Sequence, residues 1–324
     1  MTKPKNTDAL MKHLRNECNI EIHGSKQKKQ LISYGYYHGY KGYRFFKKKS
    51  TRIPFTNFSE IVAVIEYDNN LKAALYPELM FIETALKNIV CNASIDGLKY
   101  STFDYIYKER MNDDTTNSNL QLNRLRLRNK IYSRLSDTYK HEENNDNKMV
   151  RHFYNRGQDA PIWVIFEILY LSELGNFCCC LNKNTRIKIL KQLKMYDISI
   201  DTNGNLLPYT IFALKSLRNS VAHNNIIFDA RFKDRKVATI LKRWTEIETG
   251  INNITLYSLI DYIIVICCIL KRISFSKERS KILLRKYEEE TKKLQNSVTP
   301  EIYNIIIQQN VPEKIQRLKE YINR

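Results

Sequence analysis

Apolar residues recur at spacings of three and four along most of the chain, and residues that interrupt regular structure are sparse. Only nine glycines and seven prolines occur in 324 residues. A spacing of three and four matches the period of an amphipathic helix, whereas a protein of many short strands needs more frequent turns. The pattern therefore predicts an all-α fold.

The clearest helical signals lie in the first third of the chain. Asn57 or Ser59 is suited to cap a helix over 58–75, because both side chains accept hydrogen bonds from free N–H groups at a helix start. Pro77 favours the first turn of a helix, so a second helix is expected over 78–93.

Further along, residues 111–120 and 142–148 are rich in Asn and Asp and are expected to be exposed loops. Pro161 is expected to open one apolar helix that ends near Gly175, with Trp163 in the core. On charge and pattern we divide the chain into a basic, aromatic-rich segment 1–52, a helical core 53–270 and a basic helical extension 271–324.

The most apolar stretch, residues 254–270, is about as long as the shortest membrane spans of ~17 residues. Because it contains Asp261, a buried helix is the better interpretation. The first thirty residues are polar and basic and contain no apolar signal region, so a cytoplasmic location is expected.

The chain is strongly basic, with 53 Lys and Arg against 34 Asp and Glu and a net charge of +19. The excess is greatest at the two ends, where residues 1–52 carry 13 basic against three acidic residues. This balance favours a polyanionic partner, either nucleic acid or a membrane surface. The membrane alternative ranks last, because no amphipathic anchor with Trp or Phe is evident.

Seven cysteines occur without CxxC pairs or Cys/His pairs at zinc-ligand spacing, so reduced core thiols are expected. Cys178, Cys179 and Cys180 are adjacent, and adjacent helical residues point about 100° apart, which opposes binding of one ion by all three. We expect neither a metal nor another cofactor.

Residues 31–46 combine tyrosines and glycines with basic side chains. These tyrosines suit stacking on bases, or they simply pack on helices, and the sequence leaves both interpretations open. The candidate RNA-binding residues here and in the preceding basic cluster are Lys26, Lys28, Lys29, Tyr36, Tyr37, Lys41, Arg44, Lys47, Lys48 and Lys49.

A polar motif lies in a helix expected to begin near Tyr209 and to end at 224–225. Asn219 and His223 are four residues apart and share one side of the helix, and the long side chain of Arg218 can reach the same ligand. A histidine in the last turn has its cationic form favoured by the helix dipole.

These residue types suit metal-independent RNA cleavage. That reaction needs a base for the ribose 2′-OH, an acid for the leaving 5′-oxygen and positive charge beside the phosphorus. His223 can transfer either proton near neutral pH, and Arg218 can hold two phosphate oxygens. Because one chain offers a single such histidine, two protomers are the simplest source of the acid and the base.

The motif and its surroundings resemble a known family. Residues 217–223, Leu-Arg-Asn-Ser-Val-Ala-His, resemble the Arg-Asn-x3-His signature of HEPN ribonucleases. Four further elements, in the right order over about residues 30–235, resemble the Abi-like (AbiD and AbiF type) abortive-infection proteins: 34–40 with its aromatic-glycine pattern, Tyr67-Asp68 with Leu71-Lys72, 81–87 around Glu83, and Pro161-Ile-Trp163 with Glu167.

This resemblance implies a HEPN-like helical bundle, a dimeric composite site formed by Arg218, Asn219 and His223, and RNA products that end in a 2′,3′-cyclic phosphate. It also implies a toxin-like role in antiviral defence and association with a small structured RNA, as in toxin-antitoxin systems. Glu83 and Lys87 are expected to support the site. Lys72 and Lys87 stand where the family usually has Arg, which keeps the charge but not the bidentate geometry.

Two hypotheses follow from the sequence. The first is an endoribonuclease that acts as a defence toxin. The second is a catalytically silent RNA-binding protein that holds a structured small RNA. Both predict RNA binding with steep salt dependence, and only the first predicts an effect that His223→Ala abolishes without loss of RNA affinity.

Overall fold

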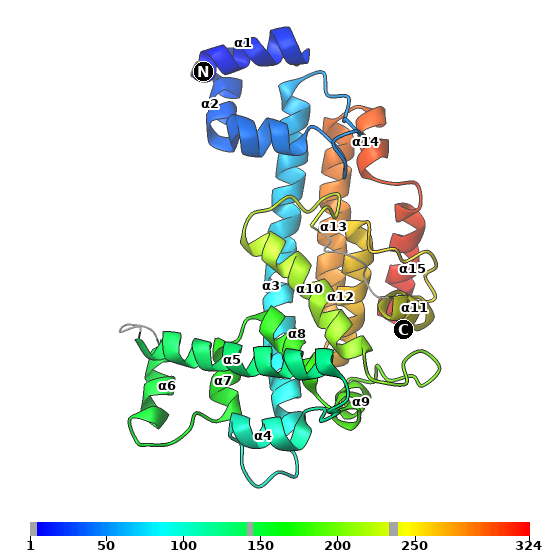
Figure 1. Cartoon of the computed structure of the whole chain (residues 1–324). Helices are drawn as coiled ribbons and strands as arrows, with labels where there is room; N and C mark the ends of the chain where they lie inside the picture. The colour runs from blue at the N-terminus through cyan, green and yellow to red at the C-terminus, as the bar shows by residue number, and fades with distance from the viewer. Residues whose placement is uncertain (1–4, 141–144, 233–238) are drawn as a thin grey trace. The chain divides into compact units, whose positions relative to one another are not determined.

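The computed structural model describes residues 5–140, 145–232 and 239–324, and all regular structure in these residues is helical (Figure 1). They contain no β-strand, which confirms the all-α prediction. The helices are α1 (Thr7–Cys18), α2 (Gly24–Tyr34), the π-helix η1 (Gly35–Lys41), α3 (Phe58–Ile95), α4 (Phe103–Arg110), α5 (Ser118–Lys140), α6 (Asn145–Tyr154), α7 (Ile162–Ile168), α8 (Leu171–Cys180), α9 (Lys183–Gln192), α10 (Leu206–Ala222), α11 (Thr239–Thr249), α12 (Leu259–Ile273), α13 (Glu278–Ser297), α14 (Pro300–Ile306) and α15 (Val311–Asn323).

The chain forms two compact units, each assembled from separate stretches of sequence. Unit 1 contains residues 1–78, 217–234 and 245–324, and unit 2 contains 79–216 and 235–244. Helices α3 and α10 contribute to both units. The basic segments 1–52 and 271–324, which are far apart in sequence, therefore belong to the same unit.

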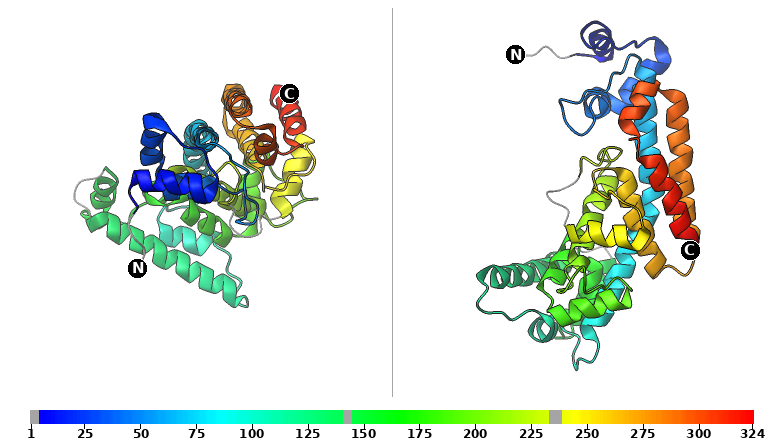
Figure 2. Two further views of the ribbon diagram at one scale, coloured as in Figure 1. Left: turned by 90° about the horizontal axis from the view of Figure 1, so that it is seen from above. Right: turned by 90° about the vertical axis from the view of Figure 1, so that its right-hand side faces the viewer.

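The core of unit 1 is built around α12, which packs against α13 and α15 (Figures 1 and 2). Every α12 residue from Leu259 to Leu270 is buried, as expected for an all-round apolar helix. Asp261 is fully buried and pairs with Lys314 of α15 at 2.6 Å, which compensates its charge. No described helix is long and apolar enough to cross a membrane.

Unit 2 is organised around α5, which packs against α6, α7 and α8. Helix α8 approaches α10 closely at Gly175, where a Cβ atom would lie 2.6 Å from a ring carbon of Phe212. Only glycine allows this packing without a shift of the aromatic ring.

Three helix predictions were wrong in their boundaries. The helices expected on either side of Pro77 form one continuous helix, α3. Buried residues on both sides, such as Leu75 and Leu79, provide apolar packing that offsets the hydrogen bond that proline cannot make. The single helix expected from Pro161 is two helices, α7 and α8, because the Glu173 carboxylate accepts the backbone N–H of Tyr170 at 2.8 Å and starts a new helix.

Other local predictions had mixed outcomes. Asn57 caps α3, since its side-chain oxygen accepts the Ser59 N–H at 2.8 Å. Trp163 was expected in the core, but it lies on the solvent side of α7 and is 48% exposed. Residues 111–117 form a loop as predicted, whereas 118–120 already belong to α5. Residues 145–148 are helical rather than a loop, and 142–144 lie outside the described residues.

Candidate functional site

The polar motif lies at the end of α10, and the backbone fixes where this helix stops. Helix α10 begins at Leu206, three residues before the expected start, and ends at Ala222. Asn224 has a φ of 52°, in the left-handed region that asparagine tolerates better than most residues. Its N–H binds the Val221 carbonyl at 3.3 Å, and the Asn225 N–H binds the Ser220 carbonyl at 2.8 Å. This pair of bonds is a Schellman motif, which ends the helix at a defined residue.

The three motif side chains differ in burial. The His223 N–H donates to the Asn219 carbonyl at 2.9 Å, so His223 closes the last turn of α10, although the helix ends at Ala222 and not at 224–225 as expected. Arg218 and Asn219 are half-buried, and a guanidinium nitrogen of Arg218 donates to the Asn219 side-chain oxygen at 3.4 Å. His223 is exposed. The helix end therefore presents an accessible imidazole beside a partly buried amide and guanidinium.

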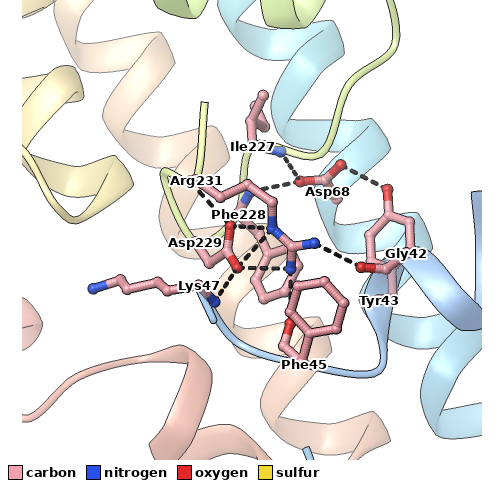
Figure 3. A network of polar contacts seen from close by, with 9 residues as sticks. All are labelled: Gly42, Tyr43, Phe45, Lys47, Asp68, Ile227, Phe228, Asp229 and Arg231. Atoms are coloured by element: carbon pink, nitrogen blue, oxygen red, sulfur yellow. Dashed lines mark hydrogen bonds and ion pairs between the residues drawn. The ribbon is translucent and has the colours of Figure 1, made fainter. Parts of the chain in front are cut away.

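The segment that follows the motif is bound to α3 through Asp68 (Figure 3). One Asp68 carboxylate oxygen accepts the backbone N–H groups of Ile227 and Phe228 at 2.9 and 2.6 Å. The other accepts the Tyr43 hydroxyl at 2.8 Å. Asp68 is fully buried, and burial together with this carboxylate raises the pKa of Tyr43 well above its usual value. The phenol therefore stays protonated and remains a donor.

Lys72, one helical turn after Asp68, compensates the buried carboxylate and also contacts the end of the motif helix. Its ammonium lies 2.8 Å from the Asp68 carboxylate and 2.8 Å from the side-chain oxygen of Asn224. It also donates to Asn69 at 3.2 Å. Because an ammonium can donate three hydrogen bonds, one lysine serves all three acceptors without the forked geometry of arginine.

A second charged network lies on the same segment (Figure 3). Arg231 binds the buried Asp229 carboxylate with both Nε and Nη2, and it donates to the backbone carbonyls of Gly42 and Phe45 at 2.7 Å each. Asp229 also accepts the Lys47 N–H at 2.6 Å. These bonds join the segment after α10 to the chain after η1. The sequence motif did not include Arg231 or Asp229.

A cavity of about 430 Å³ lies beside the motif helix in unit 1. Ser220 of α10 and Asn225 line one side, and His38, Tyr37 and Arg231 line other parts of it. The cavity thus combines aromatic, cationic and hydrogen-bonding groups. The sequence analysis did not connect His38 with residues 218–223, because about 180 positions separate it from the motif and no local pattern links them.

In the aromatic segment 31–46, some tyrosines pack on helices and others are exposed, so each of the two interpretations holds for different residues. Tyr40 and Tyr43 are buried, and Tyr43 stacks on Phe228 with ring centroids 5.8 Å apart. By contrast Tyr37 is 76% exposed, and the Lys41 ammonium lies 5.0 Å from its ring centroid. Tyr36 is half-buried and shares a hydrogen bond with His13. Of the aromatic and basic side chains in this segment, Tyr37 and His38 are exposed and accessible to a base or a phosphate, whereas Lys41 is half-buried.

The other predicted residues occupy varied surroundings. Lys28 is paired with Asp8 at 2.6 Å, whereas Lys26, Lys29, Lys48 and Lys49 are exposed. The Arg44 guanidinium lies 6.0 Å from the centroid of the Tyr40 ring, and the Lys47 ammonium lies 4.9 Å from the centroid of the Phe46 ring.

Glu83 and Lys87, predicted to support the site, lie on the part of α3 that belongs to unit 2. They are paired with each other at 3.5 Å, and Glu83 is buried.

All seven cysteines are free thiols, and five of them are buried. Burial raises the pKa of Cys91 to about 11 and that of Cys180 to about 12. Such groups are neutral thiols at physiological pH and are poor nucleophiles. Among the described residues, no cluster of three or more His, Cys, Asp or Glu side chains is placed to hold a metal ion.

The fold and the motif together define a basic, all-helical protein with an accessible histidine at a rigid helix end. The chain belongs to the Abi-like protein family, whose model matches residues 29–229. That range begins in α2 and ends at Asp229, so it includes the motif, Asp68 and Lys72. Membership indicates a role in abortive infection, a form of phage defence. No curated protein and no solved structure matches the chain.

Proposed function

We propose that this protein is a metal-independent endoribonuclease of an abortive-infection system, and that Arg218, Asn219 and His223 form its active site. The observation that carries the proposal is the exposed imidazole of His223, next to Arg218 and Asn219, at a helix end fixed by buried charges, in a member of the Abi-like family. Catalytic groups that must not move are expected on such rigid supports.

In the proposed reaction the ribose 2′-oxygen attacks the adjacent phosphorus and the bond to the 5′-oxygen breaks. A base accepts the 2′-OH proton, and an acid gives a proton to the departing 5′-oxygen. The products end in a 2′,3′-cyclic phosphate and a 5′-OH. His223 transfers one of the protons, Arg218 stabilises the extra negative charge at phosphorus, and Asn219 orients the Arg218 guanidinium through its side-chain oxygen.

The second proton-transfer group comes, in this proposal, from the motif of a partner protomer, so that the active form is a homodimer of HEPN type. The cavity lined by His38 and Tyr37 would then hold the nucleotide next to the scissile phosphate. Its aromatic and cationic groups are those that bind an unpaired base and its phosphate. The protein would act as a toxin, in an arrangement of toxin-antitoxin type, when its RNA cleavage is released in an infected cell.

The decisive experiment is cleavage of total RNA by the purified chain in excess EDTA, with analysis of the product ends. Wild type is compared with Arg218→Ala and His223→Ala, and with the matched changes Arg285→Ala and His152→Ala at exposed positions outside the motif. The proposal requires cyclic-phosphate ends that both motif variants lose and both control variants retain.

The alternative function is a catalytically silent RNA-binding protein that holds a small structured RNA. Copurified RNA must be removed first, because a bound RNA could block the site. If the stripped wild type still leaves RNA intact and binds it as tightly as His223→Ala does, the nuclease proposal fails and the binding function replaces it.

A further inference from the structure

Helix α5 of unit 2 concentrates positive charge that the composition of the whole chain conceals. It contains six basic residues and one acidic residue, although the middle of the chain is close to balanced. Arg126, Lys130 and Arg134 are spaced by four and share one side of the helix. At 1.5 Å per residue this row is about 12 Å long, which exceeds the reach of a single phosphate group.

The row lines a cavity of about 740 Å³ in unit 2. Helix α8 and the residue before it also line the cavity, with Tyr170, Glu173 and Asn176. A volume of this size lies in the range of ligand-binding sites, which is about 300–1,000 Å³.

Glu173 organises the cavity and leaves it cationic. It is 4% exposed, binds the Arg134 Nε at 3.0 Å, and lies 3.8 Å from the Lys130 ammonium. One buried carboxylate therefore pairs with two cations in a cavity that three cations line. Arg126 and Lys130 remain exposed, so they can meet anionic groups of a ligand.

Tyr170 supplies a stacking surface at the edge of the cationic row. The Arg134 guanidinium lies 3.6 Å from the Tyr170 ring centroid, and the tyrosine is nevertheless 55% exposed. The guanidinium holds the ring in place by a cation–π contact. An exposed ring fixed in this way, beside a row of cations, matches the combination of stacking and phosphate contacts by which proteins bind unpaired nucleotides.

We infer that this α5–α8 cavity binds a segment of single-stranded RNA, with an unpaired base on Tyr170 and successive phosphates along Arg126 and Lys130. A duplex does not fit this arrangement, because its bases are stacked inside the helix and unavailable to the ring. The inference rests on the proposed function only in taking RNA as the polyanion, and it concerns affinity and not the cleavage step.

The test measures binding of a fluorescein-labelled single-stranded RNA of twelve nucleotides to full-length His223→Ala protein, by anisotropy over a range of salt concentrations. Arg126→Gln/Lys130→Gln removes two cations from the cavity. Arg128→Gln/Lys140→Gln removes two from the same helix outside the cavity lining. With a contribution of about 0.7 per phosphate contact, the cavity pair should lower the slope of log K against log salt by about 1.4, and the control pair should change it little.

The base contact is tested by Tyr170→Ala and Tyr170→Phe. Loss of one stacked base is expected to weaken single-strand binding by roughly 5- to 150-fold, whereas phenylalanine retains the ring and the affinity. Binding of a duplex with the same sequence should be unaffected by Tyr170→Ala.

Two results would overturn the inference: equal loss of affinity in the two charge pairs, which indicates general attraction, or unchanged binding in Tyr170→Ala. Thermal melting verifies that each variant is folded. Cleavage by chains that retain His223 is measured separately. If no cleavage is found but RNA binding still depends on the cavity residues, the nuclease proposal fails and this binding site stands. If the chain cleaves RNA and the cavity variants bind RNA normally, this binding site alone is ruled out.

Discussion

The Lys72 ammonium lies 2.8 Å from the side-chain oxygen of Asn224, the left-handed residue that ends the motif helix. The same ammonium is 2.8 Å from the buried Asp68 carboxylate, which in turn binds the backbone just after Asn224. Lys72 and Asp68 therefore fix both the end of α10 and the direction in which the chain leaves it. His223 is the residue immediately before Asn224, so its backbone position depends on this network.

Lys72→Met should destabilise the protein strongly, because it leaves the Asp68 carboxylate buried without its cation. Breaking a buried ion pair on one side typically costs about 3–5 kcal/mol. Urea unfolding of the variant should show this loss, and RNA cleavage under folding conditions should fall because His223 is no longer held. Lys72→Arg retains the charge and should lose less stability than Lys72→Met, because the Asp68 carboxylate keeps a cationic partner. Equal stability of Lys72→Met and wild type would contradict the role assigned to the pair.

Arg231→Met should be destabilising for a related reason. It removes the partner of the buried Asp229 and two donors to the Gly42 and Phe45 carbonyls, for an expected loss of about 3–5 kcal/mol. The matched change Arg44→Met removes an arginine from the same region that stacks on Tyr40, and should cost about 1 kcal/mol or less. Chemical denaturation of both variants measures the difference, and similar losses would refute the stabilising role given to the Arg231 network.

The sequence contained the helical period and the motif but not the contacts that make the motif rigid. Asn219 and His223 could be placed on one turn because four-residue spacing determines that geometry locally. The bonds from Asp68 to Ile227 and Phe228 join residues 159 and 160 positions apart, and no local pattern encodes such pairs. The family resemblance did identify Asp68 and Lys72, without indicating what they contact.

The errors have physical causes of the same kind. Pro77 is a helix-start signal in isolation, but the buried residues around it keep α3 continuous. The break between α7 and α8 depends on the Glu173 carboxylate, a side-chain contact at a position where apolar periodicity alone favours one helix. The basic face of α5 was also missed, because the net charge was counted over long segments in which acidic residues elsewhere balance it. Tertiary contacts and local charge, rather than periodicity, decided each case.

Thiol reactivity should follow the raised pKa values. Cys91 and Cys180 have pKa values raised by burial to about 11 and about 12, so only a small fraction of each is thiolate at pH 8. Brief alkylation of the native protein at pH 8 should label half-buried Cys18 at least tenfold faster than either buried thiol, as read by peptide mass spectrometry. In denaturant, all three should react at similar rates. Rapid native labelling of Cys91 or Cys180 would be inconsistent with their burial.

His38 distinguishes two arrangements of the proposed active site. If a partner protomer supplies the second histidine, His38 contributes to binding in the cavity beside Ser220, and His38→Gln should raise KM several-fold with kcat nearly unchanged. If His38 itself transfers the second proton within one chain, kcat should fall by about 10²- to 10⁴-fold, and one limb of the pH–rate profile should disappear. His152→Gln, a histidine of unit 2, controls for general effects of the substitution. Cleavage by mixtures of wild-type and His223→Ala chains completes the comparison. If the site needs His223 of both protomers, mixed dimers are inactive and added His223→Ala chains lower the activity of wild-type chains, whereas a site complete within each chain keeps the activity of every wild-type subunit.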